Sequence, residues 1–169
     1  WNNGMKFSIV FPTGDAAAEN AAILLASAIN SLYPQPGKFH VNYQWMFPSF
    51  FRDQMYSQEL PIFITEWRSN YPDPHDLVFN FMHSKGALAA SQNYSNATAD
   101  SLIEKGIATP DGPARQQIYY DPQALYYNDV PSVPFLQPMG RDFERDWMRG
   151  WYYNPVYPGQ YVYHRWKAL

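Results

Sequence analysis

The residues whose types and spacing could support catalysis lie close together, between Asp73 and His83. Asp73 and Asp76 form a pair of carboxylic acids, and such a pair can act as general acid and nucleophile in glycoside hydrolysis. Both acids also fall in the expected first turn of a helix, where acidic side chains cap the backbone and offset the helix dipole. The capping role explains the pair better, so we predict no catalytic residue. A glycosidase that uses Asp73 and Asp76 is the enzymatic alternative.

His75, Asp76 and His83 are the only compact set of possible metal ligands in the sequence. The two histidines are separated along the expected helix by about 12 Å, which is too far for one ion. The chain contains no cysteine, which excludes a thiolate metal site and a cysteine nucleophile. It also lacks a phosphate-binding loop, a dinucleotide fingerprint, a nucleophile elbow and a zincin motif. We therefore predict no enzyme, no metal and no cofactor.

A loop rich in aromatic and polar side chains, with the sequence WRSNYPDPHD, follows a β-branched and aromatic run at 62–65. Pro72 and Pro74 restrict the backbone, so the loop should be stiff and extended. The carboxyl end of a strand leading into a helix is a common place for a ligand site in α/β proteins. We expect the ligand-binding residues to be Glu66, Trp67, Arg68, Ser69, Asn70 and Tyr71. We expect Trp67 to face the ligand, with a place in the core as its alternative.

The elements before this loop alternate between strands and helices. Alternating apolar residues and helical spacing predict strands at 5–11, 39–45 and 62–67, and helices at 16–33 and 48–57. Asp15 is the expected N-cap of the first helix. This order predicts the α/β class, with a single lobe that contains a mixed sheet of about four to six strands flanked by helices.

After the loop the sequence is mainly helical. Asp73 should cap a helix that begins at Pro74 and runs to Met82, and 86–98 should form a surface loop. Thr98 should cap a helix to residue 108, and Pro122 should kink or split another at 113–127. Three short elements complete the prediction: an edge strand at 133–136, a helical turn at 141–148 and a last strand at 161–166.

Composition limits the possible functions. Hydrophobic residues make up 46% of the 169 residues and aromatic residues 18%, which favours a folded domain. The net charge is −3 and the basic residues do not cluster, so we predict no nucleic-acid partner. No apolar run reaches the length of a membrane span.

The motif WRSNYPDPHDLVFNFMHS resembles the signature region in the C-terminal lobe of extracellular solute-binding proteins of family 5. These proteins are the receptors of peptide, nickel and oligosaccharide ABC importers. The resemblance continues, in order, through Asn93–Asn96, Ala99–Ile103, Arg115 with Ile118–Tyr119, and Asp129–Pro134. It implies that residues 1–169 are the C-terminal ligand-binding lobe of a two-lobed periplasmic-binding-protein-like fold, in a fragment without the N-terminal lobe.

The resemblance also implies a function and its partners. The full-length protein would capture an oligosaccharide or oligopeptide-like solute outside the cell or in the periplasm and deliver it to the membrane permease of an ABC importer. It would be anchored to the membrane. In the peptide receptors an aspartate that pairs with the ligand's α-amine stands where this chain has Asn70, so we expect an oligosaccharide or another ligand without a free amine, with oligopeptides as the second choice. A stand-alone carbohydrate-binding module is the other alternative.

Overall fold

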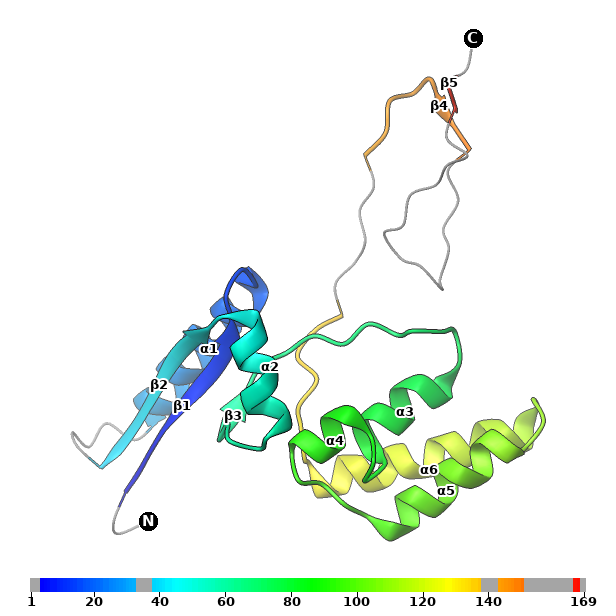
Figure 1. Ribbon diagram of the computed structural model, residues 1–169, viewed down its shortest axis with the longest axis horizontal. Coiled ribbons are helices and arrows are strands. Elements are labelled where there is room, and N and C mark those ends of the chain that lie inside the picture. The colour runs from blue at the N-terminus through cyan, green and yellow to red at the C-terminus, as the bar shows by residue number, and fades with distance from the viewer. Residues whose placement is uncertain (1–3, 33–37, 138–142, 151–165, 168–169) are drawn as a thin grey trace.

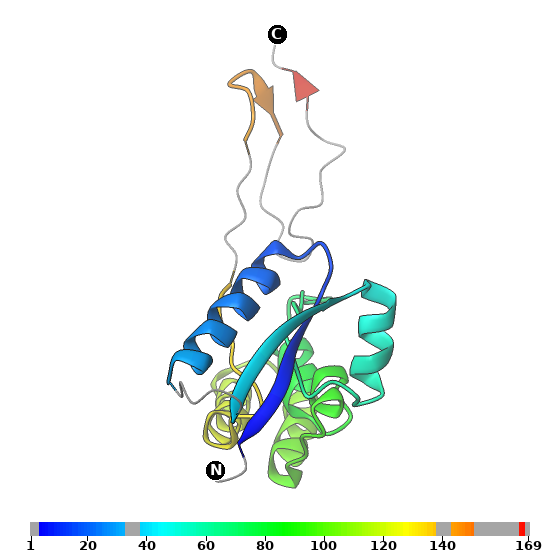
Figure 2. The same cartoon turned by 90° about the vertical axis from the view of Figure 1, so that its left-hand side faces the viewer.

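The computed structural model describes residues 4–32, 38–137, 143–150 and 166–167. Its main sheet has three parallel strands in the order β2-β1-β3. The strands are β1 (Met5–Pro12), β2 (Phe39–Met46) and β3 (Ile62–Phe63), and the helices that connect them are α1 (Ala16–Leu32) and α2 (Pro48–Tyr56). Figure 1 shows this sheet and its two helices side by side with a separate group of helices, and Figure 2 shows α1 and α2 on opposite sides of the strands.

The two faces of β1 bury alternate residues, as its sequence pattern predicts. Ile9 and Phe11 pack on one face against α1 in a cluster that includes Phe7 at its margin. Small side chains let this helix approach the sheet closely, and they are Ala18, Ala22 and Ala26. The α1 helix begins at the predicted cap, because Asp15 accepts hydrogen bonds from the N–H groups of Ala17 and Ala18.

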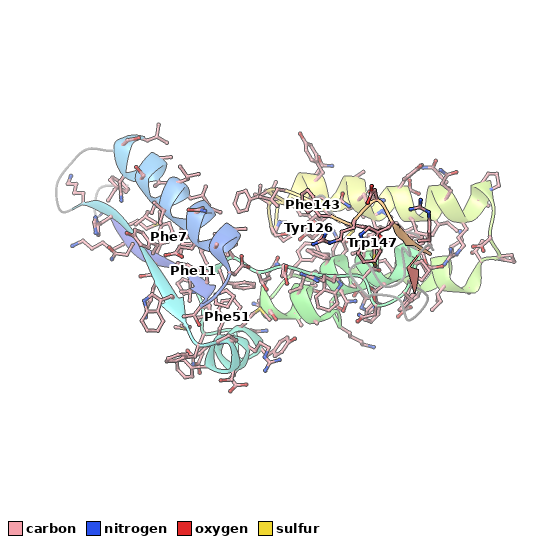
Figure 3. All side chains as sticks on the ribbon, turned by 90° about the horizontal axis from the view of Figure 1, so that it is seen from above. Phe7, Phe11, Phe51, Tyr126, Phe143 and Trp147 are labelled. Atoms are coloured by element: carbon pink, nitrogen blue, oxygen red, sulfur yellow. The ribbon has the colours of Figure 1, made fainter. Side chains whose placement is uncertain are left out.

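The opposite face of β1 joins the sheet to the helical part of the chain. Val10 packs there with Phe51 and Met55 of α2 and with Leu88 of α4 (Ala87–Ser91). Figure 3 shows that Phe7 and Phe11 lie near α1 whereas Phe51 lies on α2. The Gln58 side chain adds a hydrogen bond of 2.7 Å to the carbonyl oxygen of Ala90. Both faces of the sheet are therefore covered by helices, as the predicted α/β class requires.

The remaining helices form a compact layer, comprising α3 (Pro74–Met82), α4, α5 (Ala97–Ala108) and α6 (Pro113–Asp129). Val78 of α3, Ile103 of α5 and Tyr119 of α6 form its buried core. Gly106 allows α5 and α6 to approach, because a Cβ atom at this position would lie 2.8 Å from the Tyr119 ring. None of the helices in the described part of the chain is long and apolar enough to cross a membrane.

Several elements differ from the sequence predictions. The main sheet has three strands among the described residues, all parallel, whereas we expected a mixed sheet of four to six. The third strand is two residues long, and the predicted loop at 86–98 contains α4. Asn96 caps α5 in place of Thr98, because the Asn96 side chain accepts from the N–H groups of residues 98 and 99. The α6 helix continues through Pro122, whose side chain is buried.

Residues 130–137 and 143–150, which follow α6, are called the arm here, and 143–150 lie away from the sheet and the helices (Figure 1). Residues 133–136 form no strand, contrary to prediction. Of the helical turn predicted at 141–148, residues 145–148 form a single turn, in which the Met148 N–H donates to the Arg145 carbonyl oxygen at 2.9 Å, and residues 141–142 lie outside the described part of the chain. Apolar side chains of this arm are exposed, namely Val133, Phe135, Leu136 and Phe143. At its end β4 (Met148–Arg149) pairs with β5 (Trp166–Lys167) in antiparallel orientation. The rest of the predicted strand at 161–166 lies outside the described residues.

Candidate functional site

The connection from β3 to α3 crosses from the sheet to the helical layer (Figure 1). The last hydrogen bond to the sheet is donated by the N–H of Ile64 to the carbonyl oxygen of Val10, at 2.9 Å. From residue 65 to residue 69 no backbone N–H is paired with any described residue. An extended segment with unpaired backbone groups can bind another extended chain in the manner of an added strand.

The second half of the connection is held by one carboxylate, that of Asp76 in the first turn of α3. Its Oδ2 atom accepts hydrogen bonds from the Asn70 backbone N–H at 3.0 Å, the Ser69 hydroxyl at 3.1 Å and the Trp67 indole N–H at 3.5 Å. Its Oδ1 atom accepts from the Asn70 side-chain amide at 3.2 Å and from the Asn80 amide at 3.5 Å. Three of the predicted ligand-binding residues are thus brought together by a residue that we assigned to helix capping.

Asp76 is almost fully buried, with 3% of its surface exposed. Burial alone raises the pKa of its carboxyl, but the hydrogen bonds from Asn70, Ser69 and Trp67 outweigh it, so the pKa is lowered from its ordinary value. The group is therefore an anion at neutral pH. A buried anion needs several donors to replace its water shell, and the loop supplies them by folding over the helix end.

A second acid, Asp73, holds the end of the connection against α6. Its side chain caps α3 by accepting from the N–H of His75 at 2.8 Å, as predicted. The Arg115 guanidinium donates to both oxygens of Asp73, at 2.8 and 2.9 Å, and lies over the ring of Tyr119. The hydrogen bond from Arg115 holds the pKa of Asp73 below its ordinary value. Residues that are far apart in sequence therefore fix the start of α3.

The other predicted site residues have different surroundings. Glu66 and Arg68 are exposed and face each other in an ion pair of 3.5 Å. Tyr71 is 42% exposed, and its carbonyl oxygen accepts a hydrogen bond of 2.7 Å from Ser69. Trp67 is half-buried and packs against the cluster of Val10, Phe51, Met55 and Leu88. Trp67 therefore contacts the core with part of its ring, which is the alternative that the sequence left open.

The enzymatic alternative does not fit this geometry. A glycosidase needs one acid with a raised pKa as the proton donor, whereas the pKa values of Asp73 and Asp76 are both lowered. Their oxygens are also occupied by Arg115 and by the loop. Among the described residues, no three metal-ligating side chains lie close enough together to bind an ion.

A shallow pocket of about 240 Å³ lies between the start of α3 and α6, lined mainly by Arg115, Tyr119, Tyr120 and Gln123. This volume is below the range of roughly 300–1,000 Å³ that is usual for small-molecule sites. The charged group in it, Arg115, is already paired with Asp73 and Asp111. The pocket does not include the loop at 65–70.

Two residues of this site were not predicted from the sequence. Asp76 was interpreted as a helix-capping acid, and Arg115 was noted only as part of the family resemblance. An acid three residues after the capping Asp73, following a loop with several donors, was the available signal for Asp76. Arg115 gave no local signal, because its partner lies in a different element.

Comparison with known proteins places this fold. No family model matches the chain, and no curated protein matches it in sequence. Among solved structures, OppA of Haemophilus influenzae in complex with the peptide RPPGFSPFR is similar, with a TM-score of 0.77 and 18% identity. The likeness covers 99% of this chain and 32% of that protein.

Two further solved structures share the fold. The ABC transporter-associated periplasmic binding protein DppA from Helicobacter pylori, in complex with the peptide STSA, has a TM-score of 0.65 and 16% identity over 78% of this chain and 25% of its own. NikA from Staphylococcus aureus, in complex with Ni(L-His)2, has a TM-score of 0.65 and 17% identity over 77% of this chain and 27% of its own.

These structures are solute-binding proteins of family 5, so the resemblance seen in the sequence is confirmed at the level of the fold. The chain has the fold of part of one lobe of a two-lobed periplasmic binding protein. It spans about a third or less of the length of each.

Proposed function

We propose that this chain is the C-terminal ligand-binding lobe of a family 5 solute-binding protein that captures an oligopeptide-like solute for an ABC importer. The observation that carries the proposal is the fold likeness to OppA, which extends over 99% of the chain, the arm included. The structures that share the fold include two peptide complexes and one nickel complex. We favour a peptide over the oligosaccharide that we first expected, because the likeness includes peptide complexes.

In this proposal the segment 65–69 contacts the ligand. Its unpaired backbone groups suit an extended peptide, and the exposed side chains of Glu66, Arg68 and Asn70 stand beside them. The protein acts outside the cell or in the periplasm, delivers its ligand to a membrane permease and performs no chemistry. A second lobe closes over the ligand in this proposal, as the two-lobed fold of the similar structures implies.

The test is titration calorimetry on a two-lobed protein that contains this chain, with short peptides, N-acetylated peptides and short oligosaccharides as probes. We expect saturable binding of at least one peptide and no turnover of glycosides. Residues 1–169 alone, if they fold, should bind the same peptide much more weakly, since one lobe leaves the ligand in water. Binding of oligosaccharides alone would contradict the peptide assignment, and failure to bind any solute would contradict the proposal.

A further inference from the structure

Val130, the residue that ends α6, has a left-handed backbone, with a φ of 47° and a ψ of 51°. The other described residues that combine a side chain with a positive φ are Gln58 and Asn93, and neither is β-branched. In the left-handed region the Cβ atom crowds the following carbonyl oxygen, and branching at Cβ makes the crowding worse. Helices commonly end in this conformation, but usually with glycine or asparagine. The valine at this position is therefore under backbone strain.

Packing does not offset this strain. The Val130 side chain is 59% exposed, so it fills no gap in the core. A glycine or an asparagine would end α6 at the same place with less strain. What a valine adds is a narrow choice of backbone conformations, because a β-branched residue strongly prefers the extended region. Val130 thus has the strained conformation seen here and one relaxed alternative.

The residues on either side of Val130 are held by hydrogen bonds. Before it, the Asp129 carboxylate accepts from the Tyr94 hydroxyl at 2.8 Å. After it, the hydroxyl groups of Ser132 and Tyr126 are hydrogen-bonded to each other. The rings of Tyr94 and Tyr126 meet edge to face, with centroids 5.6 Å apart, so both contacts converge on one aromatic pair. A strained backbone persists only where its surroundings fix it, and these contacts fix Val130 from both sides.

Val130 is also the residue at which the arm begins. Apolar side chains that follow it in the arm are exposed, namely Val133, Phe135 and Leu136. The hydrogen bond between Ser132 and Tyr126 ties the start of the arm to α6. If that bond breaks, Val130 can leave the left-handed region for the extended one. A change of this size in one residue turns the chain that follows it, so the arm takes a second direction.

We propose that Val130 is a strained pivot with two backbone conformations, which sets the direction of the arm relative to the helical layer. The inference rests on the proposed function and adds to it a contribution that favours release of the ligand. The arm has the direction found in the peptide complex of OppA, since that likeness extends over 99% of the chain. The strain therefore belongs to the ligand-bound form. When the ligand leaves, Val130 relaxes and the arm turns.

The experiment compares Val130→Asn with the wild-type two-lobed protein, using trialanine as the probe and calorimetry as the readout. Asparagine tolerates the left-handed region, so the variant lowers the strain of the ligand-bound form, and we expect trialanine to bind about fivefold more tightly. Ser132→Ala removes the hydrogen bond that holds this form, so it should weaken binding severalfold. The two variants therefore have effects of opposite sign.

Val133→Asn is the matched control. Val133 also belongs to the arm and is 60% exposed, but its φ is not positive. The variant makes the same chemical change without relieving strain, so the dissociation constant of trialanine should stay at the wild-type value. A gain in affinity equal to that of Val130→Asn would mean that the polar side chain, and not the backbone, is responsible, and the inference would be wrong.

A second measurement needs no ligand. Spin labels on Gln117→Cys in α6 and Phe143→Cys in the arm report the direction of the arm as a distance by pulsed electron paramagnetic resonance. This chain contains no cysteine of its own, and Phe143 is 89% exposed, so labelling disturbs no packing. We expect two distances in the ligand-free wild type. Val130→Asn should increase the population that trialanine selects, and Ser132→Ala should decrease it.

The outcomes separate the pivot from the proposed function. If Val130→Asn leaves either the affinity or the two distance populations unchanged, Val130 only ends α6 and the inference is wrong. If the wild type binds no solute, the proposed function fails. The distance measurement then still tests the pivot in the ligand-free protein, where a single distance that Val130→Asn does not change would overturn it.

Discussion

The two halves of the connection between β3 and α3 differ in how they are held. In the first half, residues 65–68, the backbone N–H groups are unpaired among the described residues and Glu66 and Arg68 are exposed, although the Trp67 side chain between them packs against the core. In the second half, residues 69–76, the buried Asp76 carboxylate accepts hydrogen bonds from the loop, and Arg115 of α6 donates hydrogen bonds to Asp73. Backbone N–H groups that could bind a ligand thus lie directly beside polar side chains that already form hydrogen bonds within the protein.

This difference shows how a loop can be both available and rigid. A segment with unpaired backbone groups would sample many conformations if both of its ends were free, and binding would then carry a large entropic cost. Here one end is fixed to the sheet through Ile64 and the other to Asp76. The second half, which is anchored by Asp76 and Asp73, therefore preorganises the first half, whose backbone N–H groups are available to a ligand. Such preorganisation is the usual requirement of a precise binding site.

The largest loss of stability should come from breaking the ion pair between Asp73 and Arg115, which joins the connection to α6. Replacing Arg115 with methionine keeps the side-chain volume but leaves Asp73 without its cation, so we expect a loss of about 3 kcal/mol in the free energy of unfolding. Urea denaturation would measure this. Asp111→Asn is the control, because Asp111 contacts the same guanidinium but its side chain is 92% exposed. Equal losses in the two variants would contradict the importance of the Asp73 contact.

Removing Trp67 should have the next largest effect. The ring packs against the cluster around Val10 and donates to Asp76, but it is only half-buried, so Trp67→Ala should cost about 2–3 kcal/mol, less than a fully buried ring. Trp45→Ala is the matched control, since Trp45 is 57% exposed. Thermal unfolding of both variants would test this. A melting temperature unchanged in Trp67→Ala would mean that the ring serves the ligand alone.

The strands and the helix caps next to this site could be predicted from sequence because their causes are local. Alternation placed β1 and β2 to within one residue, and the Asp73–Pro74 pair gave the start of α3. The length of β3 could not be predicted in this way. Its strand-like residues extend to Thr65, but the partner strand β1 ends in Pro12, which has no backbone N–H with which to continue the ladder.

The roles of Asp76 and Pro122 depended on tertiary structure. An acid in the first turn of a helix ordinarily serves the helix, and only the return of the loop over the helix end gives the Asp76 carboxylate its four hydrogen bonds from Trp67, Ser69 and Asn70. A proline inside a helix removes one backbone hydrogen bond, yet α6 continues because Ile118, Tyr119 and Tyr126 on the same helix are buried. Local propensity cannot reveal either outcome.

Protonation of Asp73 and Asp76 at acid pH should lower the stability of the fold, but by less than the two substitutions above. The pKa values of Asp73 and Asp76 are both lowered from the ordinary value of 3.8, so the folded state binds fewer protons than the unfolded chain as the pH falls through this region. The stability that these groups contribute is complete above about pH 4 and is lost as the pH falls through their lowered pKa values. Urea denaturation at a series of pH values would show this.

Asp73→Asn provides the comparison for the acid titration. Asparagine is also a good helix cap, so this variant removes the titrating group while it retains the capping oxygen. Its stability should be lower than that of the wild type at neutral pH, and the gap should narrow as the pH falls below 4. A gap that stays constant down to pH 2 would show that the charge of Asp73 contributes nothing.

The smallest effect on stability is expected from the exposed side chains of the first half, Glu66 and Arg68. Glu66 and Arg68 form an ion pair of 3.5 Å with both side chains more than half exposed, and such pairs contribute at most about 1 kcal/mol because water and salt screen them. Glu66→Gln and Arg68→Gln should therefore unfold at nearly the same urea concentration as the wild type, and added salt should not separate them. In the two-lobed protein the same variants should weaken binding of trialanine, since both side chains lie along the segment proposed to contact the ligand. A large loss of stability in either variant would show that this half is anchored too, and unchanged binding in both would move the ligand away from it.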